Sequence, residues 1–356
     1  MSEWKTVRLG DYITEYSVKN KSNEDIPVYS VTNTQGFCTE YFSKDVSSKD
    51  KSNYKIVPRG CFAYNPSRIN VGSVDWQRYE DRVIVSPLYN VFKVSPELEN
   101  QYLYYFLKSD IGHTLITSKA EGSVRDNLKI TMLAEFSIPL PPLEEQKHIA
   151  AMLDKCTALV TKYKLMLEKY DTLIKSRFIE MFGDPKINSS NLPTKKFIEV
   201  VKLQRGFDLP VQERNQDGLF NVYGSNGPLD KHDSFKVKAP GIVTGRSGTL
   251  GNVYYVLEDY WPLNTTLFSV DIHNNNVVYL KYLLELYDLS RFSEGAGVPT
   301  LNRNIVHDKD IIDVPLSLQN DFAAFVQQID KSKFAVQKLL EKAETLYKSL
   351  MQLYFA

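Results

Sequence analysis

Two long segments of the chain have apolar residues at the heptad spacing of an amphipathic helix. The first runs from about Leu143 to Met181, and the second from about Gln319 to the C-terminus. Apolar side chains at positions a and d of successive heptads are typical of a coiled coil, and further apolar residues at position e widen the stripe. We predict a seam made by Ile149, Met152, Cys156, Leu159, Tyr163, Met166, Tyr170 and Leu173 in the first helix, and by Phe322, Phe325, Ile329, Val336, Leu339, Leu346 and Leu350 in the second.

Each predicted helix is about 60 Å long at ~1.5 Å per residue, longer than a compact domain needs. An apolar stripe of that length requires a partner that covers it. Because the two segments have similar length and register, we expect them to pair as an antiparallel intramolecular coiled coil. Ser332 interrupts the second seam at a d position.

The remaining residues, 1–142 and 184–314, have short β-prone runs separated by Asn, Gly and Ser turns. Examples are Arg82-Val83-Ile84-Val85 and Gly251-Asn252-Val253-Tyr254-Tyr255-Val256. Such runs predict twisted, largely antiparallel sheets with a few short helices. Gly183-Asp184-Pro185 should end the first long helix, since proline cannot continue it. The predicted fold class is α+β, with helix segments 143–183 and 315–356 following the two mixed domains.

A weak internal duplication with a period of about 176 residues relates the two halves. Phe92 corresponds to Phe268, Tyr102 to Tyr279, Asn127 to Asn302, and Ile138-Pro139-Leu140 to Val314-Pro315-Leu316. A period this long indicates duplicated domains and not a solenoid. The duplication predicts a pseudo-two-fold arrangement that offers two similar surfaces to two copies of one partner.

Composition places the chain among ordinary folded proteins. It has no apolar run long enough for a membrane helix and no signal peptide at its start, so we expect a cytoplasmic protein. Its 43 basic and 43 acidic side chains cancel, which is unusual for a protein that binds nucleic acid. The charges must then be sorted onto separate faces, or partner subunits must supply part of the phosphate contact.

No motif in the sequence indicates catalysis or a metal site. The loop Gly245-Arg246-Ser247-Gly248-Thr249-Leu250-Gly251 matches neither nucleotide-binding pattern, and Asn65-Pro66-Ser67-Arg68 lacks the second proline and the aromatic residue of an adenine methyltransferase loop. The five histidines have no i, i+4 partner and no cysteine partner. A tight turn that presents Arg246 and Ser247 is the favoured interpretation of the glycine-rich loop.

The order of these segments resembles the specificity-subunit family of type I restriction-modification systems over essentially the whole chain. The strongest resemblance lies in residues 138–155 and 176–185, supported by the two loops named above. The resemblance implies two target-recognition domains, 1–142 and 184–314, that read a bipartite double-stranded DNA site. It also implies helices that dock two methyltransferase subunits, and through them restriction and motor subunits. S-adenosylmethionine, ATP and Mg²⁺ would belong to those partners, and this chain would be non-catalytic with no cofactor of its own.

The sequence departs from the family pattern in two places. The second proline-rich step is reduced to Val314-Pro315-Leu316-Ser317-Leu318, and Ser332 and Lys333 weaken the second seam. Both departures bear on how the helices pair.

DNA contact requires Arg, Lys, Asn, Gln or Ser side chains on loops, because these groups make most hydrogen bonds to base edges and phosphates. The candidates are Arg68, Asn70, Arg78, Arg82, Lys119, Arg125 and Asn127 in the first domain, and Arg205, Arg214, Asn226, Arg246, Ser247, Arg291, Asn302 and Arg303 in the second. For each, a solvated or salt-bridged surface residue is the alternative interpretation. Asn127 and Asn302 have a further alternative, which is to hold the turn before the last strand of each domain.

Two other functions are compatible with parts of the sequence. An enzyme that fuses recognition with modification would need a cofactor loop and a catalytic Asn/Asp-Pro-Pro-aromatic segment, which the sequence lacks. A coiled-coil scaffold with two protein-binding or glycan-binding modules is compatible with the balanced charge. Two DNA readers, by contrast, need a stiff connection that holds them at a fixed separation, because DNA repeats every ~34 Å.

Overall fold

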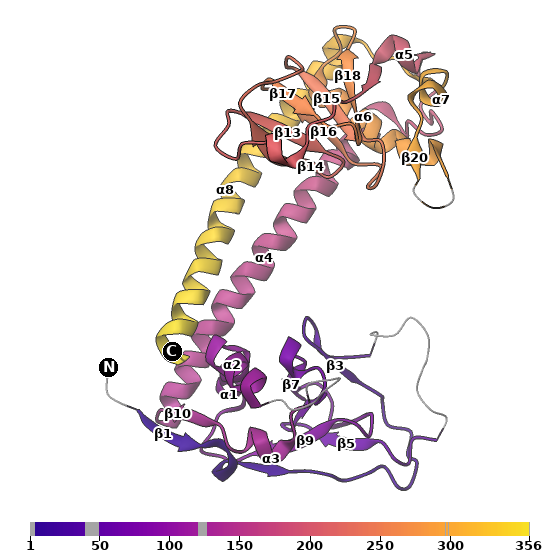
Figure 1. The fold of residues 1–356 in the computed structure, drawn as a ribbon. Helices are drawn as coiled ribbons and strands as arrows, with labels where there is room; N and C mark the ends of the chain where they lie inside the picture. The colour runs from indigo at the N-terminus through magenta and orange to yellow at the C-terminus, as the bar shows by residue number, and fades with distance from the viewer. Residues whose placement is uncertain (1–3, 40–49, 120–126, 296, 298, 356) are drawn as a thin grey trace. The chain divides into compact units, whose positions relative to one another are not determined.

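The computed structural model describes residues 4–39, 50–119, 127–295, 297 and 299–355. The chain forms two compact units, and each is described by itself. Unit 1 comprises Met1–Lys162 with Leu339–Ala356, and unit 2 comprises Tyr163–Lys338. Two helices, α4 (Leu143–Phe182) and α8 (Leu316–Phe355), are unbroken, and each has one half in either unit (Figure 1).

The globular part of unit 1 is a mixed α+β domain. Its elements are β1 (Lys5–Arg8), η1 (Leu9–Asp11), β2 (Ile13–Glu15), β3 (Ser30–Thr32), β4 (Gly36–Cys38), β5 (Lys55–Pro58), β6 (Phe62–Tyr64), η2 (Ile69–Val71), β7 (Val74–Trp76), β8 (Arg82–Val85), β9 (Asn90–Val94), α1 (Asn100–Lys108), α2 (Asp110–Lys119), α3 (Ile130–Leu133) and β10 (Ser137–Leu140). The main sheet is antiparallel, with the order β2-β9-β6-β7. Strands β1 and β10, from the two ends of the domain, pair separately.

Unit 2 repeats this plan. Its elements are β11 (Thr194–Lys196), α5 (Phe197–Val200), β12 (Lys202–Arg205), η3 (Val211–Glu213), β13 (Phe220–Gly224), β14 (Gly227–His232), β15 (Gly241–Gly245), β16 (Val253–Val256), β17 (Tyr260–Pro262), β18 (Thr266–Asp271), α6 (Val277–Tyr287), η4 (Leu289–Phe292), β19 (Ser293–Glu294), β20 (Thr300–Leu301), α7 (Arg303–His307) and β21 (Asp310–Ile312). The antiparallel sheet has the order β12-β18-β15-β16, and β11 pairs with β21.

The two units therefore share one topology. Strands β2, β9, β6 and β7 of unit 1 correspond to β12, β18, β15 and β16 of unit 2, and helices α1 and α3 correspond to α6 and α7. Phe92 and Phe268, which the sequence period relates, lie on the corresponding strands β9 and β18. The duplication predicted from the sequence is confirmed at the level of the fold.

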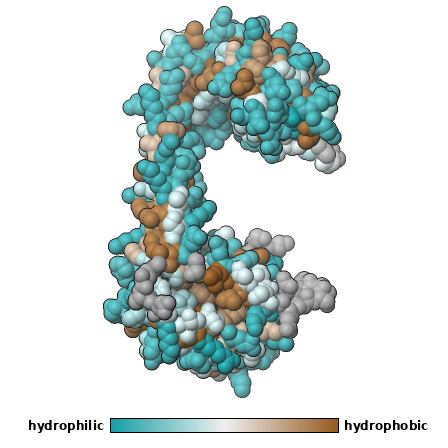
Figure 2. All heavy atoms as spheres, turned by 60° about the vertical axis from the view of Figure 1, so that its left-hand side comes forward, coloured by the Kyte–Doolittle hydropathy of each residue, from teal (hydrophilic) through white to brown (hydrophobic). Residues whose placement is uncertain are grey.

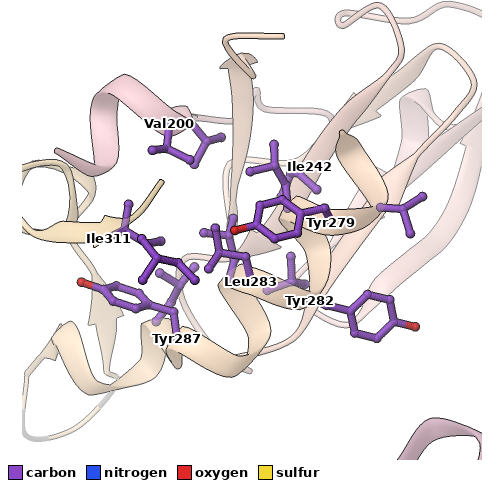
Figure 3. Packing of buried hydrophobic residues seen from close by; sticks show 14 of the residues in the cluster. Val200, Ile242, Tyr279, Tyr282, Leu283, Tyr287 and Ile311 are labelled. Carbon is purple, nitrogen blue, oxygen red and sulfur yellow. The ribbon is translucent and has the colours of Figure 1, made fainter. Parts of the chain in front are cut away.

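Each unit has one main apolar core between its sheet, its helices and the long helices. In unit 2, side chains from α5, β15, α6 and β21 point toward one another, as Val200, Ile242, Leu283 and Ile311 show in Figure 3. Tyr279 of α6 stacks on Phe178 of α4 with ring centroids 5.6 Å apart. The end of α4 is thus part of the core of unit 2.

A buried glutamine fastens each domain to its long helix. Gln146 is fully buried, accepts a hydrogen bond from Glu99 N (2.8 Å), and donates to the carbonyl oxygens of Glu97 (3.0 Å) and Pro141 (2.9 Å). Its counterpart Gln319 is 1% exposed, accepts from Asn276 N (2.8 Å), and donates to Asn275 Oδ1 (2.7 Å) and Val314 O (2.8 Å).

Glu99 and Asn276 are the N-caps of α1 and α6, so each glutamine joins the starts of two helices. Sequence reasoning missed this pair. Its signal is a glutamine four residues after the proline that precedes each long helix.

The long helices pack against each other inside each unit. In unit 1, Ile149 and Leu153 from the first half of α4 share a core with Met351 and Phe355 from the end of α8. In unit 2 the pairing is reversed, because Ile174, Phe178 and Phe182 from the end of α4 share a core with Phe322 and Val326 from the start of α8. The predicted antiparallel intramolecular coiled coil is confirmed.

The seam keeps predicted a positions but uses the e positions in place of the predicted d positions. Leu153, Ile174, Val326 and Leu340, at the predicted e positions, are buried together with the predicted a residues Ile149, Cys156, Phe322 and Val336. Four predicted d residues are exposed instead: Leu159 (39%), Leu173 (45%), Leu339 (45%) and Leu346 (50%). Met152, Tyr163, Met166, Tyr170, Phe325, Ile329 and Leu350 are half-buried.

The reason for the shift is that positions d and e are both apolar, as in Leu159-Val160. Spacings a to e and e to a are four and three residues, which also form a heptad stripe. The apolar pattern alone does not show which edge of a wide stripe faces the partner. With the seam moved, Lys333 and not Ser332 lies in it, and Lys333 Nζ is 2.5 Å from Asp171 Oδ1 on α4.

Among the described residues, no helix is long and apolar enough to cross a membrane.

His307 attaches α7 to the sheet of unit 2. Its Nε2 accepts a hydrogen bond from the backbone N–H of Leu203 on β12 (3.0 Å), so that nitrogen is unprotonated. Burial, followed by the nearby Arg303 cation, lowers the pKa of His307 below its ordinary value. Protonation would break this link between α7 and β12.

We predict that acid destabilises unit 2 through His307. A histidine whose folded pKa is depressed binds its proton more readily in the unfolded chain, so stability is lost as the pH falls below about 6.5. His307→Gln keeps an acceptor for Leu203 N–H but does not titrate. Thermal unfolding between pH 7.5 and 5 should show a larger loss of Tm for the wild type than for the variant. Parallel pH profiles for the two proteins would contradict the assignment.

Candidate nucleic-acid interface

One loop occupies the same place in both units. Residues 65–73 connect β6 to β7 in unit 1, and residues 246–252 connect β15 to β16 in unit 2. A backbone hydrogen bond from a buried leucine holds each loop: Leu128 N donates to Pro66 O (3.1 Å), and Leu301 N donates to Arg246 O (2.8 Å). The two segments noted in the sequence as supporting turns are therefore structural equivalents.

In unit 2 several candidate residues meet at this loop. The backbone N–H groups of Arg246 and Ser247 both donate to Thr265 O (2.8 and 3.2 Å), and Arg205 Nε donates to the neighbouring Asn264 O (3.4 Å). Asn226 is exposed in the turn between β13 and β14, next to the half-buried Ser225. A Cβ added at Gly248 would lie 3.5 Å from Ser225 Oγ. Arg205, Asn226, Arg246 and Ser247 thus belong to one surface.

Both arginines and one carboxylate lie near this surface, since Asn264, whose carbonyl oxygen accepts from Arg205, donates through its side-chain amide to Asp208. Within the described part of the chain, neither Arg205 nor Arg246 forms an ion pair with a carboxylate. Arg205 is exposed, and the hydrogen bond that it makes within the described residues goes to the carbonyl oxygen of Asn264. Two guanidinium groups with Ser and Asn side chains form a donor set suited to phosphate oxygens and to guanine or adenine edges.

Asn302 has a local structural role. It is the N-cap of α7, and its side chain accepts from Asn304 N (3.1 Å). This matches the structural alternative considered for it, although Asn302 remains exposed. Arg303 follows at the start of α7 and is half-buried close to His307.

In unit 1 the corresponding loop contains Arg68, which is exposed, and Asn70, which is half-buried in η2. Asn127 is exposed and directly precedes Leu128. Because Leu128 and Leu301 make equivalent hydrogen bonds, the counterpart of Asn127 is Thr300, and the counterpart of Asn302 is Lys129, the N-cap of α3. The sequence alignment, which pairs Asn127 with Asn302, therefore differs by two residues from the correspondence in the structure.

Five other candidates are engaged within the protein. Arg78 stacks on the Trp76 ring (4.5 Å) and pairs with buried Asp75. Arg82 pairs with Glu24 (2.6 Å) and Lys119 with Glu135 (2.8 Å). Arg214 donates to Leu209 O and lies 3.7 Å from Asp230, and Arg291 lies over Tyr287 and Phe292. Arg125 lies outside the described residues.

Sequence reasoning missed Ser225 and Asn264, whose positions beside Arg246 depend on strands distant in the chain. The sequence signal for Ser225 is the turn Ser225-Asn226-Gly227, which also contains the candidate Asn226. The described residues contain no group of three or more His, Cys, Asp or Glu side chains placed to hold a metal ion.

Comparison with known proteins points to one family. Residues 1–169 match the family model described as the type I restriction modification DNA specificity domain. Among known relatives, the MjaX specificity subunit assigned to a type I restriction enzyme of Methanocaldococcus jannaschii is 20% identical over 266 residues, which cover 71% of this chain. The EcoKI specificity subunit of Escherichia coli K12 is 34% identical over 74 residues, or 21% of this chain.

The matches span 61% and 16% of the lengths of these two relatives.

Solved structures share the fold over nearly the full length. The S subunit of a type I restriction-modification system from M. genitalium is 17% identical, with a TM-score of 0.64 over 99% of this chain and 96% of that chain. A chain from a structure on complex assembly and conformational transition of the type I R-M system is also 17% identical. Its TM-score is 0.59 over 100% and 98% of the two chains. Over residues 1–169 this chain is similar to the DNA specificity domain of type I restriction-modification systems, and its fold over nearly the full length is that of solved specificity subunits.

Proposed function

We propose that this chain is the non-catalytic DNA-reading subunit of a type I restriction-modification complex. The observation that carries the proposal is the pair of equivalent loops, 65–73 and 246–252, on two copies of one domain. A duplicated reader is what a bipartite site requires. In this proposal residues 1–142 and 184–314 are the target-recognition domains, and each reads one half-site of double-stranded DNA.

The loop surfaces have the chemistry for direct readout. Arginine contacts guanine through two parallel hydrogen bonds, and asparagine does the same for adenine, at ~1–3 kcal/mol of discrimination per pair. Arg246 and Asn226 in unit 2, and Arg68 and Asn70 in unit 1, place these two types of side chain on the equivalent loop regions.

The long helices support a fixed separation of the half-sites. Helices α4 and α8 are each 40 residues without a break, and each packs into the core of the domain at either end. A paired helix resists bending far better than a flexible linker does. We therefore expect one spacer length between the half-sites.

The exposed edge of the apolar stripe supports docking of other subunits. Leu159, Leu339, Leu346 and Leu353 are between 39% and 50% exposed in unit 1, and Figure 2 shows hydrophobic atoms on the surface of the paired helices. A row of exposed leucines is an expected contact surface for another protein. In unit 2, Leu165, Leu173, Ile179 and Phe334 are also exposed on the same two helices. We assign these edges to two methyltransferase subunits.

The chemistry of the complex would then belong to those partners. S-adenosylmethionine is the methyl donor of the methyltransferase subunits, and ATP and Mg²⁺ serve the restriction and motor subunits that join through them. The complex works in the cytoplasm, where the DNA is.

We predict that the methyltransferase partner strengthens DNA binding. The chain has no net charge, so the phosphate attraction that drives sequence-independent affinity is small. In a gel-shift titration the isolated subunit should bind weakly, with a strong salt dependence, and addition of the methyltransferase should lower Kd by at least about tenfold. Equal affinity with and without that partner would count against the proposal.

We predict that Arg246→Ala and Arg68→Ala affect different half-sites. Sequencing that detects methylated bases in the host genome first identifies the bipartite site. In competition binding by the complex, each variant should lose about 5- to 100-fold discrimination at a base pair of one half-site only. If the arginine contacts phosphate instead, affinity should fall for all sequences. The slope of log K against log salt concentration should then become less steep by about one.

Lys195→Ala is the control, because Lys195 pairs with Asp313 at the β11–β21 end of unit 2. If the arginine variants bind DNA as this control does, the two loops are not part of the DNA interface.

We predict that Leu346→Ser weakens docking of the methyltransferase. Leu346 is 50% exposed, so the substitution should lower Tm little while removing apolar area from the contact surface. Co-purification or calorimetry should show at least about tenfold weaker association. Leu88→Ser is the matched control, since Leu88 is 76% exposed on the β8–β9 turn of the globular domain. Equal association of both variants would exclude this edge of α8.

A further inference from the structure

We propose that the turn between β3 and β4 is a second DNA-reading element of unit 1, in which Gln35 contacts a base edge and Lys108 is the positioning residue. This inference rests on the proposed function and names residues of the same interface that no sequence motif indicated. The turn, Asn33-Thr34-Gln35, is exposed at all three positions.

The topology of unit 2 supports the choice of this turn. A β-hairpin lies between the first sheet strand and the second in both units: β3–β4 follows β2, and β13–β14 follows β12. In unit 2 the hairpin turn with Ser225 and Asn226 lies against loop 246–252. The corresponding turn of unit 1 should then lie against loop 65–73, and its contacts show that it does.

Lys108, the last residue of α1, joins the two segments. Its Nζ donates to Asn33 Oδ1 (3.1 Å) and Asn33 O (3.3 Å) on the hairpin, and to Gly72 O at the end of the loop with Arg68 and Asn70. Burial lowers the pKa of Lys108, and the carboxylate of Asp75 opposes that shift. Three oxygen acceptors from two segments fix one cation, so the hairpin turn and the loop are held as one surface.

Glycine at position 72 allows this close approach. Gly72 has φ +86°, and a Cβ there would lie 2.5 Å from Asn33 Oδ1. A second junction reinforces the first, because the buried carboxylate of Asp75 on β7 accepts from Phe37 N (3.1 Å) on β4. Strands β3 and β4 therefore pack on β7, as Figure 1 shows for β3 and β7.

Gln35 is the residue of this turn with the chemistry for base readout. Its backbone N–H donates to Thr32 Oγ1 (3.1 Å), which fixes the turn, and the residue is exposed. Its amide has one acceptor and two donors, and glutamine pairs with adenine through N6 and N7. Among the described residues its side-chain amide has no hydrogen-bond partner.

The test uses the complex with its methyltransferase and the bipartite site found by methylation sequencing. Gln35→Ala should lose about 5- to 100-fold discrimination at one base pair of the half-site that Arg68→Ala also affects, and none in the other half-site. Asn53→Ala is the control, an exposed amide before β5. Unchanged discrimination for Gln35→Ala, in a complex that still reads its bipartite site, overturns this inference and leaves the proposed function standing. A wild-type complex without bipartite specificity overturns both.

The positioning role of Lys108 has its own readout. Lys108→Met should alter discrimination in the same half-site, and Lys108→Arg should retain it. Asn33→Ala removes one acceptor at the exposed turn, and should give a weaker effect of the same kind with little change in Tm. A fall in Tm for Lys108→Met, with Asn33→Ala leaving discrimination unchanged, would reduce Lys108 to a structural residue.

Discussion

The apolar stripe on each long helix is the constraint on which the rest of this structure depends. Neither α4 nor α8 can expose a stripe of 40 residues to water, so the start of one packs against the end of the other. In unit 1 this places Met351 and Phe355, from the last turns of the chain, in a core with Ile149 and Leu153. The core of unit 1 is therefore completed by a helix that follows unit 2 in the chain.

Polar interactions then set the orientation of each domain on its helix. Apolar packing is non-directional, whereas the three hydrogen bonds of Gln146 or Gln319 require one geometry. Both glutamines are buried, so a displaced domain would leave an amide without partners, at a cost of ~1–3 kcal/mol or more. The connection β6–β7 then presents the loop with Arg68, which Leu128 holds. The equivalent connection β15–β16 presents the loop with Arg246, which Leu301 holds. Rigid support of this kind is what sequence-specific recognition needs from a loop.

The structure shows how the acidic and basic side chains of the chain are used. Many basic side chains are paired with carboxylates, including Arg82 with Glu24, Lys119 with Glu135 and Lys195 with Asp313. At the loop surface of unit 2 few arginines lack a carboxylate partner within the described residues. Recognition in the proposed function thus depends on a small number of placed donors, and the general attraction to phosphate is left to other subunits.

The sequence by itself determined the α+β class, the duplication, the two long helices and their antiparallel pairing, because heptads and a long repeat are periodic signals within the chain. It also identified the loops with Arg68 and Arg246. Only the tertiary structure decided which edge of the apolar stripe is buried, so that Leu159 and Leu346 are exposed while Leu153 and Leu340 are in the seam. It also decided which cations are neutralised, such as Arg78 by Asp75, and which segments meet at a loop, such as Asn33 with Gly72. These outcomes depend on contacts between residues distant along the chain, and a local pattern does not record the partner of a side chain.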